Sequence, residues 1–221
     1  MRAFIELAKI VFGAWLLGFC FCSGTLAQKV VEAVPGSAPN IMGSLVGKTY
    51  TNPVLGFSME LHDGGVVLNS AEIEVYKNAG IDNLKNGNNN EQIEAGTRKE
   101  IILINYMKKP VGSTSNSILV ISALKSNDGT SAAMVVAATL RALSASGKFE
   151  ITKSLSGMSI GGLKAEGIEG SLTVSTGAKI TQRLLVVIRN GYTIALTVAG
   201  TDDEGWNSAQ DLLDSLKFFK K

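Results

Sequence analysis

Lys179–Arg189 (KITQRLLVVIR) and Tyr192–Val198 (YTIALTV) are two apolar runs separated only by Asn190-Gly191. Both runs are rich in β-branched and aromatic residues, which favour strands. An Asn-Gly pair between such runs is typical of a two-residue turn, because both turn positions need a positive φ. The sequence therefore predicts a β-hairpin over residues 179–198.

The segments on either side extend this hairpin into a larger unit. Upstream, Glu166–Ser175 (EGIEGSLTVS) alternates in part and follows Gly161-Gly162, which predicts a third antiparallel strand entered through a tight glycine turn. Downstream, apolar residues recur at helical spacing, which predicts an amphipathic helix packed on the sheet. These residues are Trp206, Ala209, Leu212, Leu213 and Leu216.

The start of that last helix carries a capping pattern. Thr201 is the predicted N-cap and Glu204 follows three residues later, as in a capping box. Asp202 and Asp203 favour the positive end of the helix dipole. We interpret these acidic residues as capping groups and not as a metal site.

The earlier part of the domain adds further strands and two helices. Tyr50–Leu61 predicts two short strands around an Asn52-Pro53 turn, and Ile101–Met107 and Ile118–Leu124 predict two more. The predicted helices run from Asn69, with Glu72 as its capping partner, to about Lys85, and from Thr130 to about Ala145, with Met134, Ala137, Leu140 and Leu143 facing inward. The order ββαββαβββα predicts an α+β fold in which helices flank one largely antiparallel sheet.

Residues 1–27 resemble a secretory signal peptide. Arg2 and Lys9 precede the apolar run Ile10–Phe21, and small residues follow it up to Ala27, the predicted cleavage position. The run is about 12 residues long, short of the roughly 20 that span a bilayer as a helix. We therefore expect a secreted or periplasmic protein with no stable membrane span after leader removal.

Removal of the leader changes which chemistry the chain can perform. It takes away Cys20 and Cys22, so the mature chain is expected to have no thiol nucleophile, thiolate metal site or disulfide. It also removes two basic residues and one acidic residue, which lowers the formal net charge from +2 to +1. Such a balance predicts no nucleic-acid partner and no strong attraction to anionic lipid. Pro35, Pro39 and scattered small residues predict a flexible arm over 28–47, followed by a single domain over 48–221.

Motifs that resemble catalytic or phosphate-binding signatures have simpler explanations. His62 is the only histidine, which excludes a site built from several histidines. Gly157-Met158-Ser159-Ile160-Gly161 matches the G-x-S-x-G pattern, but a nucleophile elbow must lead from a strand into a helix and Gly162 follows at once. Gly43–Thr49 has one residue too few between its glycines for a phosphate-binding P-loop.

The remaining candidates are also interpreted as structural. Two carboxylate pairs are better explained as solvated side chains than as a glycan-cleaving pair. An Asn-Asp-Gly stretch is better explained as a turn than as a calcium loop, and a tryptophan as a core residue than as a platform for a ligand. The residues concerned are Glu91 with Glu94, Glu166 with Glu169, Asn127-Asp128-Gly129, and Trp206. The sequence thus predicts no catalytic residue, no cofactor and no metal ligand.

The order of elements, together with four local features, resembles the PsbP-like superfamily over about Lys48–Lys221. The features are residues 50–59 (YTNPVLGFSM), 160–165 (IGGLKA), the hairpin end at 189–198, and 215–218 (SLKF). The resemblance implies an α/β/α sandwich that binds or assembles other components without catalysis. It carries no catalytic residue to this chain.

Three function classes follow from these observations. The first is an exported, non-catalytic binding or assembly module of the cell envelope, whose partner is another envelope protein engaged through Gln28–Gly47. The alternative is a carrier of a small or lipidic ligand in a pocket between sheet and helices. The third is an enzyme that uses carboxylates, Ser159 or His62.

Overall fold

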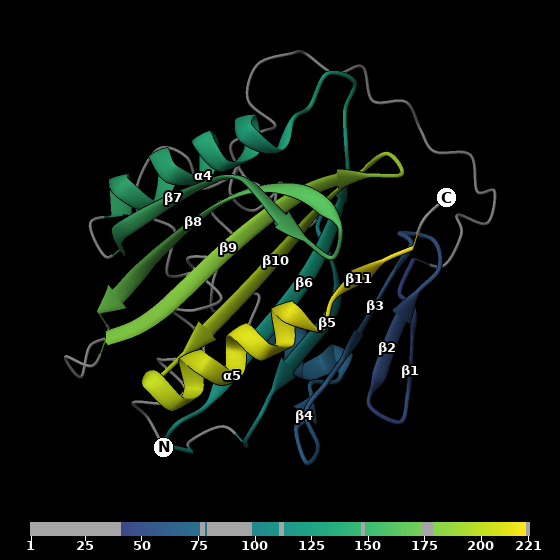
Figure 1. Ribbon diagram of the computed structural model, residues 1–221, viewed down its shortest axis with the longest axis vertical. Helices are drawn as coiled ribbons and strands as arrows, with labels where there is room; N and C mark the ends of the chain where they lie inside the picture. Colours follow the sequence, from purple (N-terminus) through teal and green to yellow (C-terminus); the bar gives the residue numbers. More distant parts are fainter. Residues whose placement is uncertain are drawn as a thin grey trace.

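The coordinates are those of a computed structural model, which describes residues 41–75, 78, 99–110, 113–146, 149–173 and 179–219. The predicted leader, most of the predicted arm, the end of the helix expected to reach about Lys85, and the Glu91–Glu94 pair lie outside the described residues. The described residues form two sheets, helices α4 and α5, and a helical segment over 70–75 (Figure 1).

The larger sheet has seven antiparallel strands in the order β4-β5-β6-β10-β9-β8-β7. Strands β7 to β10 follow one another as a meander, and β10 then pairs with β6 in the centre. The strands are β4 (Val66–Val67), β5 (Ile101–Met107), β6 (Ser117–Lys125), β7 (Phe149–Ile160), β8 (Leu163–Thr173), β9 (Lys179–Arg189) and β10 (Tyr192–Gly200).

The smaller sheet has four antiparallel strands in the order β1-β2-β3-β11. They are β1 (Ser44–Val46), β2 (Thr49–Asn52), β3 (Phe57–Glu60) and β11 (Lys217–Phe218). The prediction of a single sheet is therefore wrong. The first three strands pair with one another in a sheet of their own, and the chain returns after the last helix to add β11, with Phe218 opposite Phe57.

The predicted hairpin is confirmed at the level of single residues. Asn190 has φ 52° and Gly191 φ 75°, as a two-residue turn with both centres in the left-handed region requires. β9 and β10 pair without interruption from Arg189 opposite Tyr192 to Thr181 opposite Gly200. The glycine turn at 161–162 is confirmed as well, since both residues have positive φ and join β7 to β8.

The helices cover opposite faces of the larger sheet, which gives an α/β/α arrangement and confirms the predicted α+β class (Figure 1). Helix α4 (Ala132–Ser146) packs on β7, β8 and β9, and helix α5 (Asp203–Asp214) packs on β10 and β6 on the other face. Each face has its own apolar core, and the core under α5 includes the inner side of the smaller sheet. Among the described residues, no helix has both the length and the apolar character needed to cross a bilayer.

The helix starts follow the predicted chemistry, with shifts of one residue in two cases. The predicted cap at Asn69 is confirmed, because its Oδ1 accepts from the Glu72 amide while Glu72 Oε2 accepts from the Asn69 amide. Helix α4 is capped by Ser131 and not by Thr130, since Ser131 Oγ accepts from the Met134 amide. Leu143 is buried as predicted, but Met134 is 60% exposed, so its predicted inward orientation is wrong.

Residues 41–47, at the end of the range predicted as the arm, are joined to the smaller sheet. β1 pairs with β2, and Asn52 Nδ2 donates to the Ile41 carbonyl over 2.6 Å. The Tyr50 hydroxyl donates to the Met42 carbonyl. These contacts hold residues 41–42 against the turn that follows β2, so Ile41 is buried.

Candidate functional site

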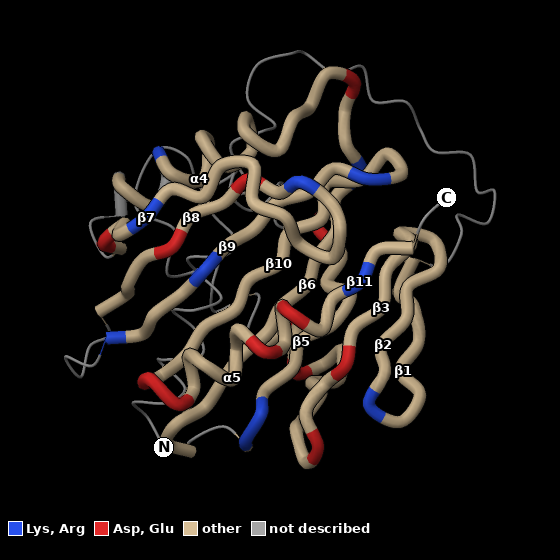
Figure 2. Tube along the Cα trace, in the orientation of Figure 1, with Lys and Arg blue, Asp and Glu red and all other residues tan. Residues whose placement is uncertain are grey.

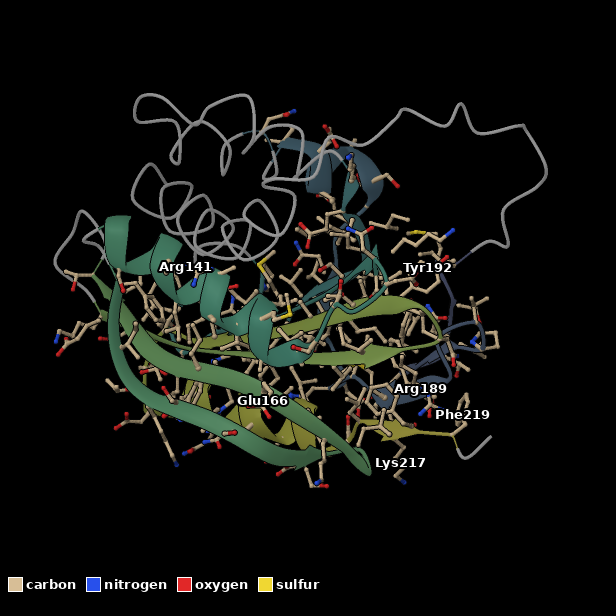
Figure 3. The ribbon with its side chains drawn as sticks, turned by 90° about the horizontal axis from the view of Figure 1, so that it is seen from above. Arg141, Glu166, Arg189, Tyr192, Lys217 and Phe219 are labelled. Atoms are coloured by element: carbon tan, nitrogen blue, oxygen red, sulfur yellow. The ribbon has the colours of Figure 1, made fainter. Side chains whose placement is uncertain are left out.

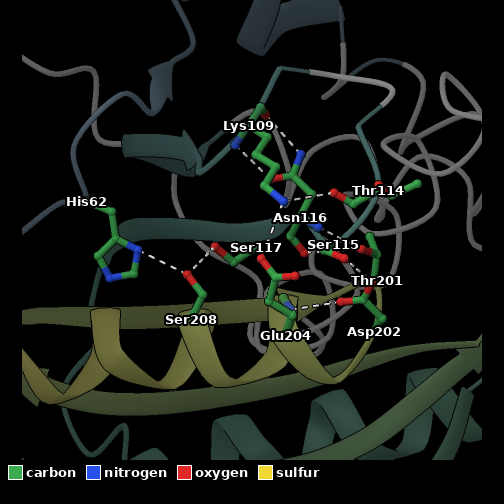
Figure 4. Close-up of polar contacts among 11 residues, drawn as sticks. His62, Lys109, Thr114, Ser115, Asn116, Ser117, Thr201, Asp202, Glu204 and Ser208 are labelled. Atoms are coloured by element: carbon green, nitrogen blue, oxygen red, sulfur yellow. Dashed lines mark hydrogen bonds and ion pairs between the residues drawn. The ribbon is translucent and has the colours of Figure 1, made fainter.

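A group of polar side chains joined by hydrogen bonds lies where α5 begins, and it is called the α5-start cluster below (Figure 4). It brings together the loop between β5 and β6, the start of β6, the end of β10, the first turns of α5 and the segment after β3. Its members are His62, Lys109, Thr114, Ser115, Asn116, Ser117, Thr201, Asp202, Glu204 and Ser208.

Asn116 is the buried centre of the loop contacts. Its Oδ1 accepts from the Lys109 amide and its Nδ2 donates to the Lys109 carbonyl, each over 2.9 Å. Its own amide donates to Thr201 Oγ1 over 2.9 Å, and its carbonyl accepts from the Thr201 amide. Asn116 therefore fixes the β5–β6 loop to the end of β10, and Thr201 is engaged there.

The N-cap of α5 is Asp202, so the prediction of Thr201 as N-cap is wrong by one residue. Asp202 Oδ1 accepts from the Gly205 amide over 2.8 Å, and Oδ2 accepts from the Ser115 hydroxyl over 2.6 Å. The hydrogen bond from Ser115, then that from Gly205, holds the pKa of Asp202 below its usual value. Thr201 is unavailable as a cap because Asn116 already engages its side chain and its amide. The capping role predicted for this acidic stretch is confirmed for Asp202.

A chain of three polar side chains runs from the surface into the core. His62 Nδ1 lies 3.0 Å from Ser208 Oγ, which lies 3.1 Å from Ser117 Oγ. Burial, and then the nearby charge of Lys108, lowers the pKa of His62, although Asp211 and Asp63 act in the opposite direction. A neutral imidazole beside a hydroxyl is the arrangement that general bases use. Here, however, Ser208 is only 4% exposed and Ser117 is fully buried, so these hydroxyls face the protein interior.

Gly65, three residues after His62, lies against the ring of Tyr106. A Cβ built on Gly65 would lie 2.1 Å from Tyr106 Oη, so only glycine fits against this ring. The Tyr106 hydroxyl donates to the His62 carbonyl over 3.1 Å. The segment after β3 is thereby fixed to β5, which sets the position of the imidazole.

The structure does not bring together Ser159 and His62, the nucleophile and base that an enzyme would have used. Ser159 is an exposed residue of β7 opposite Lys164, and a turn into β8 follows it, so the G-x-S-x-G pattern lies in a strand–turn–strand unit. His62 instead contacts Ser208. The P-loop-like stretch is also a strand unit, because β1 lies between Gly43 and Gly47.

Of the two candidate carboxylate pairs, Glu166 and Glu169 lie among the described residues, and each has its own partner. Glu166 Oε1 accepts from the Gly157 amide, whereas Glu169 pairs with Arg183. Because they are three apart in one strand, they point to opposite faces of the sheet. Asn127-Asp128-Gly129 is a turn, as predicted, with Gly129 at φ 80°. Within the described ranges, no group of three His, Cys, Asp or Glu residues could hold a metal ion.

Trp206 is more exposed than its predicted core role implies. Its ring packs partly on the core under α5, and the Arg183 guanidinium lies over it at 5.2 Å from the ring centroid. Arg183 also donates two hydrogen bonds to Glu169 Oε2. Sequence reasoning missed Arg183, Asn116 and Ser208, because each acts through a partner on a distant element.

Comparison with known proteins shows only remote similarity. No family model and no curated protein matches the chain. A solution structure of cyanobacterial PsbP (CyanoP) from Synechocystis sp. PCC 6803 is similar at 13% identity and a TM-score of 0.48, over 80% of this chain and 98% of that one. LpqN of Mycobacterium tuberculosis, described as involved in cell envelope biogenesis, is 15% identical with a TM-score of 0.39, over 55% and 79% of the two chains. A protein from Bacteroides thetaiotaomicron is 14% identical with a TM-score of 0.42, over 79% of this chain and 49% of its own length.

Proposed function

We propose that this chain is an exported, non-catalytic module of the cell envelope that binds another envelope protein. The observation that carries the proposal is the exposure of β1. Leu45 is 42% exposed and Val46 75%, although both belong to a strand. β1 is the outer strand of its sheet, and no described strand pairs with its free edge. Such an edge favours a partner that adds an extended segment.

Two further features support this function. β1 lies at the end of the range predicted as the arm, so a partner that engages the chain through Gln28–Gly47 would meet this strand edge. The hydroxyls nearest to the single imidazole are buried and bonded to each other, which supports a structural role for that contact. The signal-peptide pattern of residues 1–27 supports export.

The test is native mass spectrometry of the protein purified from its host's envelope. We expect a chain that begins at Gln28 with a second polypeptide bound, and loss of that polypeptide in Leu45→Ser/Val46→Ser. The matched control is Val75→Ser, because Val75 is 66% exposed but belongs to the helical segment over 70–75. A bare chain from wild type, or equal loss in the control, contradicts the proposal.

A specific observation also favours the alternative of a small-molecule carrier. Three side-chain atoms on the α4 face of the larger sheet are buried without a hydrogen-bond partner: Asn105 Nδ2, Gln182 Oε1 and Thr197 Oγ1. Asn105 and Thr197 share this face because both lie opposite Val120, a core residue under α4. An unpaired buried polar group costs about 1–3 kcal/mol, so a ligand that pairs with these atoms would be stabilised.

Thr197→Val tests the carrier function because it removes the hydroxyl and keeps the shape. If a ligand pairs with Thr197, the wild-type protein from the host carries an added small-molecule mass and the variant does not. If no ligand pairs there, neither protein carries the mass and the variant unfolds at a higher temperature, since it no longer buries an unpaired hydroxyl.

A further inference from the structure

A second surface lies at the end of the larger sheet opposite to the α5-start cluster. Lys125, Tyr192 and Arg189 form one row across β6, β10 and β9, because Tyr192 lies directly opposite both of the others. Lys217 in β11 and the exposed Phe219 lie at the same end (Figure 3). These five residues are called the hairpin-end surface below.

Among the described residues, the cations of this surface have no acidic partner. Lys125 and Lys217 are exposed, and within the described ranges neither side chain forms a hydrogen bond or ion pair. Elsewhere in the described chain, Lys109, Lys179 and Arg183 each pair with a carboxylate. Figure 2 shows basic residues at the end of β9 and in β11. Asp128 follows Lys125 by three residues but forms no ion pair with it.

Arg189 is held in place by groups that leave its charge uncompensated. Its Nη2 donates to the Phe219 carbonyl, and its guanidinium lies 5.3 Å from the centroid of the Phe218 ring. Its Nε is buried without a hydrogen-bond partner. Gly56 lets the guanidinium approach the backbone, since a Cβ there would lie 3.1 Å from Nη2. The charge of Arg189 therefore has a fixed position, and no carboxylate of the described residues pairs with it.

We infer that the hairpin-end surface binds carboxylates of an acidic polypeptide segment. This inference rests on the proposed function and names a docking surface distinct from β1. Lys125 and Arg189 flank Tyr192, and Lys217 adds a third cation at the same end, so the surface complements acidic side chains. An arginine guanidinium favours a carboxylate as partner. An anionic membrane is a poorer match, because the formal net charge of the chain is only +2 and Phe219, at 41% exposed, is the one exposed large apolar side chain among the five residues.

The distance between Lys125 and Arg189 sets the spacing of the acidic side chains that the surface fits. Lys125 and Arg189 are separated by two strand spacings, about 10 Å. Three residues of an extended chain cover about the same distance. The surface therefore fits a segment with acidic side chains about three residues apart.

The test is fluorescence anisotropy with a fluorescein-labelled octaglutamate peptide and the mature chain, with octaglutamine as the neutral probe. We expect octaglutamate to bind and octaglutamine not to bind, and the affinity to fall with added salt. Lys125→Gln/Lys217→Gln removes two exposed charges and is expected to weaken binding about tenfold. The matched control is Lys48→Gln/Lys153→Gln, two exposed lysines outside this surface, which should change the affinity less than about twofold.

Equal weakening by both double variants, or no binding of octaglutamate at all, overturns the inference. So does binding of wild type to vesicles with 30% phosphatidylglycerol, lost in Lys125→Gln/Lys217→Gln, when the peptide does not bind. None of these results concerns the envelope complex that depends on Leu45 and Val46, so failure here and failure of the proposed function are separate outcomes.

Discussion

The two ends of strand β6 differ in how their polar groups are used. β6 begins at Ser117, in the α5-start cluster, and ends at Lys125, in the hairpin-end surface. At the first end, hydrogen bonds join Asn116 to Thr201 and Ser117 to Ser208. At the second end, the Lys125 side chain forms no hydrogen bond or ion pair with a described residue, and no described carboxylate pairs with Arg189.

This difference separates groups that hold the fold from groups that are available to another molecule. Polar groups that satisfy each other inside the protein stabilise it, and they are costly to remove once buried. Exposed cations without partners contribute little to stability. Substitutions at the two ends should therefore have opposite signatures, large for folding at the α5-start cluster and small for folding at the hairpin-end surface.

The largest effect on stability is expected for Gly205→Ala. The new Cβ would lie 2.3 Å from the Asn116 carbonyl oxygen, so α5 or the β5–β6 loop must move. We expect the free energy of unfolding to fall by about 3 kcal/mol in urea denaturation. Asn207→Ala, at an exposed position of the same helix, is the control and should change it by less than about 0.5 kcal/mol. An unchanged free energy of unfolding in Gly205→Ala would show that this end of β6 is loosely packed.

A smaller loss is expected for Ser208→Ala. It leaves the fully buried Ser117 hydroxyl and His62 Nδ1 without their partner. The expected cost is about 1–2 kcal/mol in the same assay. Adding Ser117→Ala should recover part of the lost free energy of unfolding, because the double variant no longer buries an unpaired Ser117 hydroxyl. Full additivity of the two substitutions would contradict the hydrogen bond.

The pH dependence of stability tests the environment of His62. Burial first, and then Lys108, lowers the pKa of His62 below its ordinary value of 6.5, so the unfolded chain binds the proton more tightly. This residue therefore stabilises the fold above pH 6.5, and the contribution is lost as the pH falls through the folded-state pKa. We expect the melting temperature to decrease between pH 7 and pH 5 less steeply in His62→Asn than in wild type. Equal slopes would contradict a lowered pKa of the half-buried imidazole.

The smallest effect on stability is expected for Lys125→Gln/Lys217→Gln. Both side chains are exposed and unpaired, so the free energy of unfolding should change by less than about 0.5 kcal/mol. Urea denaturation in parallel with Ser208→Ala gives the comparison directly. A loss as large as that of Ser208→Ala would remove the distinction between the two ends.

Local sequence patterns predicted the fold better than they predicted the polar groups at either end of β6. The hairpin at 190–191 and the Asn69–Glu72 cap were readable because their signals lie within four residues. β7 was missed because it is an edge strand with mostly exposed residues and no alternation. β11 was missed because two residues carry no periodicity.

The polar clusters could not be predicted for a different reason. His62 and Ser208 are 146 residues apart, and no spacing rule links them. Lys125 and Arg189 come together only through the register of β6, β10 and β9. Sequence periodicity indicates which residues face a core, but it does not indicate which strand lies beside which.

Native mass spectrometry on the host-purified protein, with wild type and Leu45→Ser/Val46→Ser side by side, tests the central claim most directly. We expect wild type to retain a second polypeptide and the variant, equally folded, to release it. Retention of the same polypeptide by both proteins, or a bare chain from wild type, would contradict it.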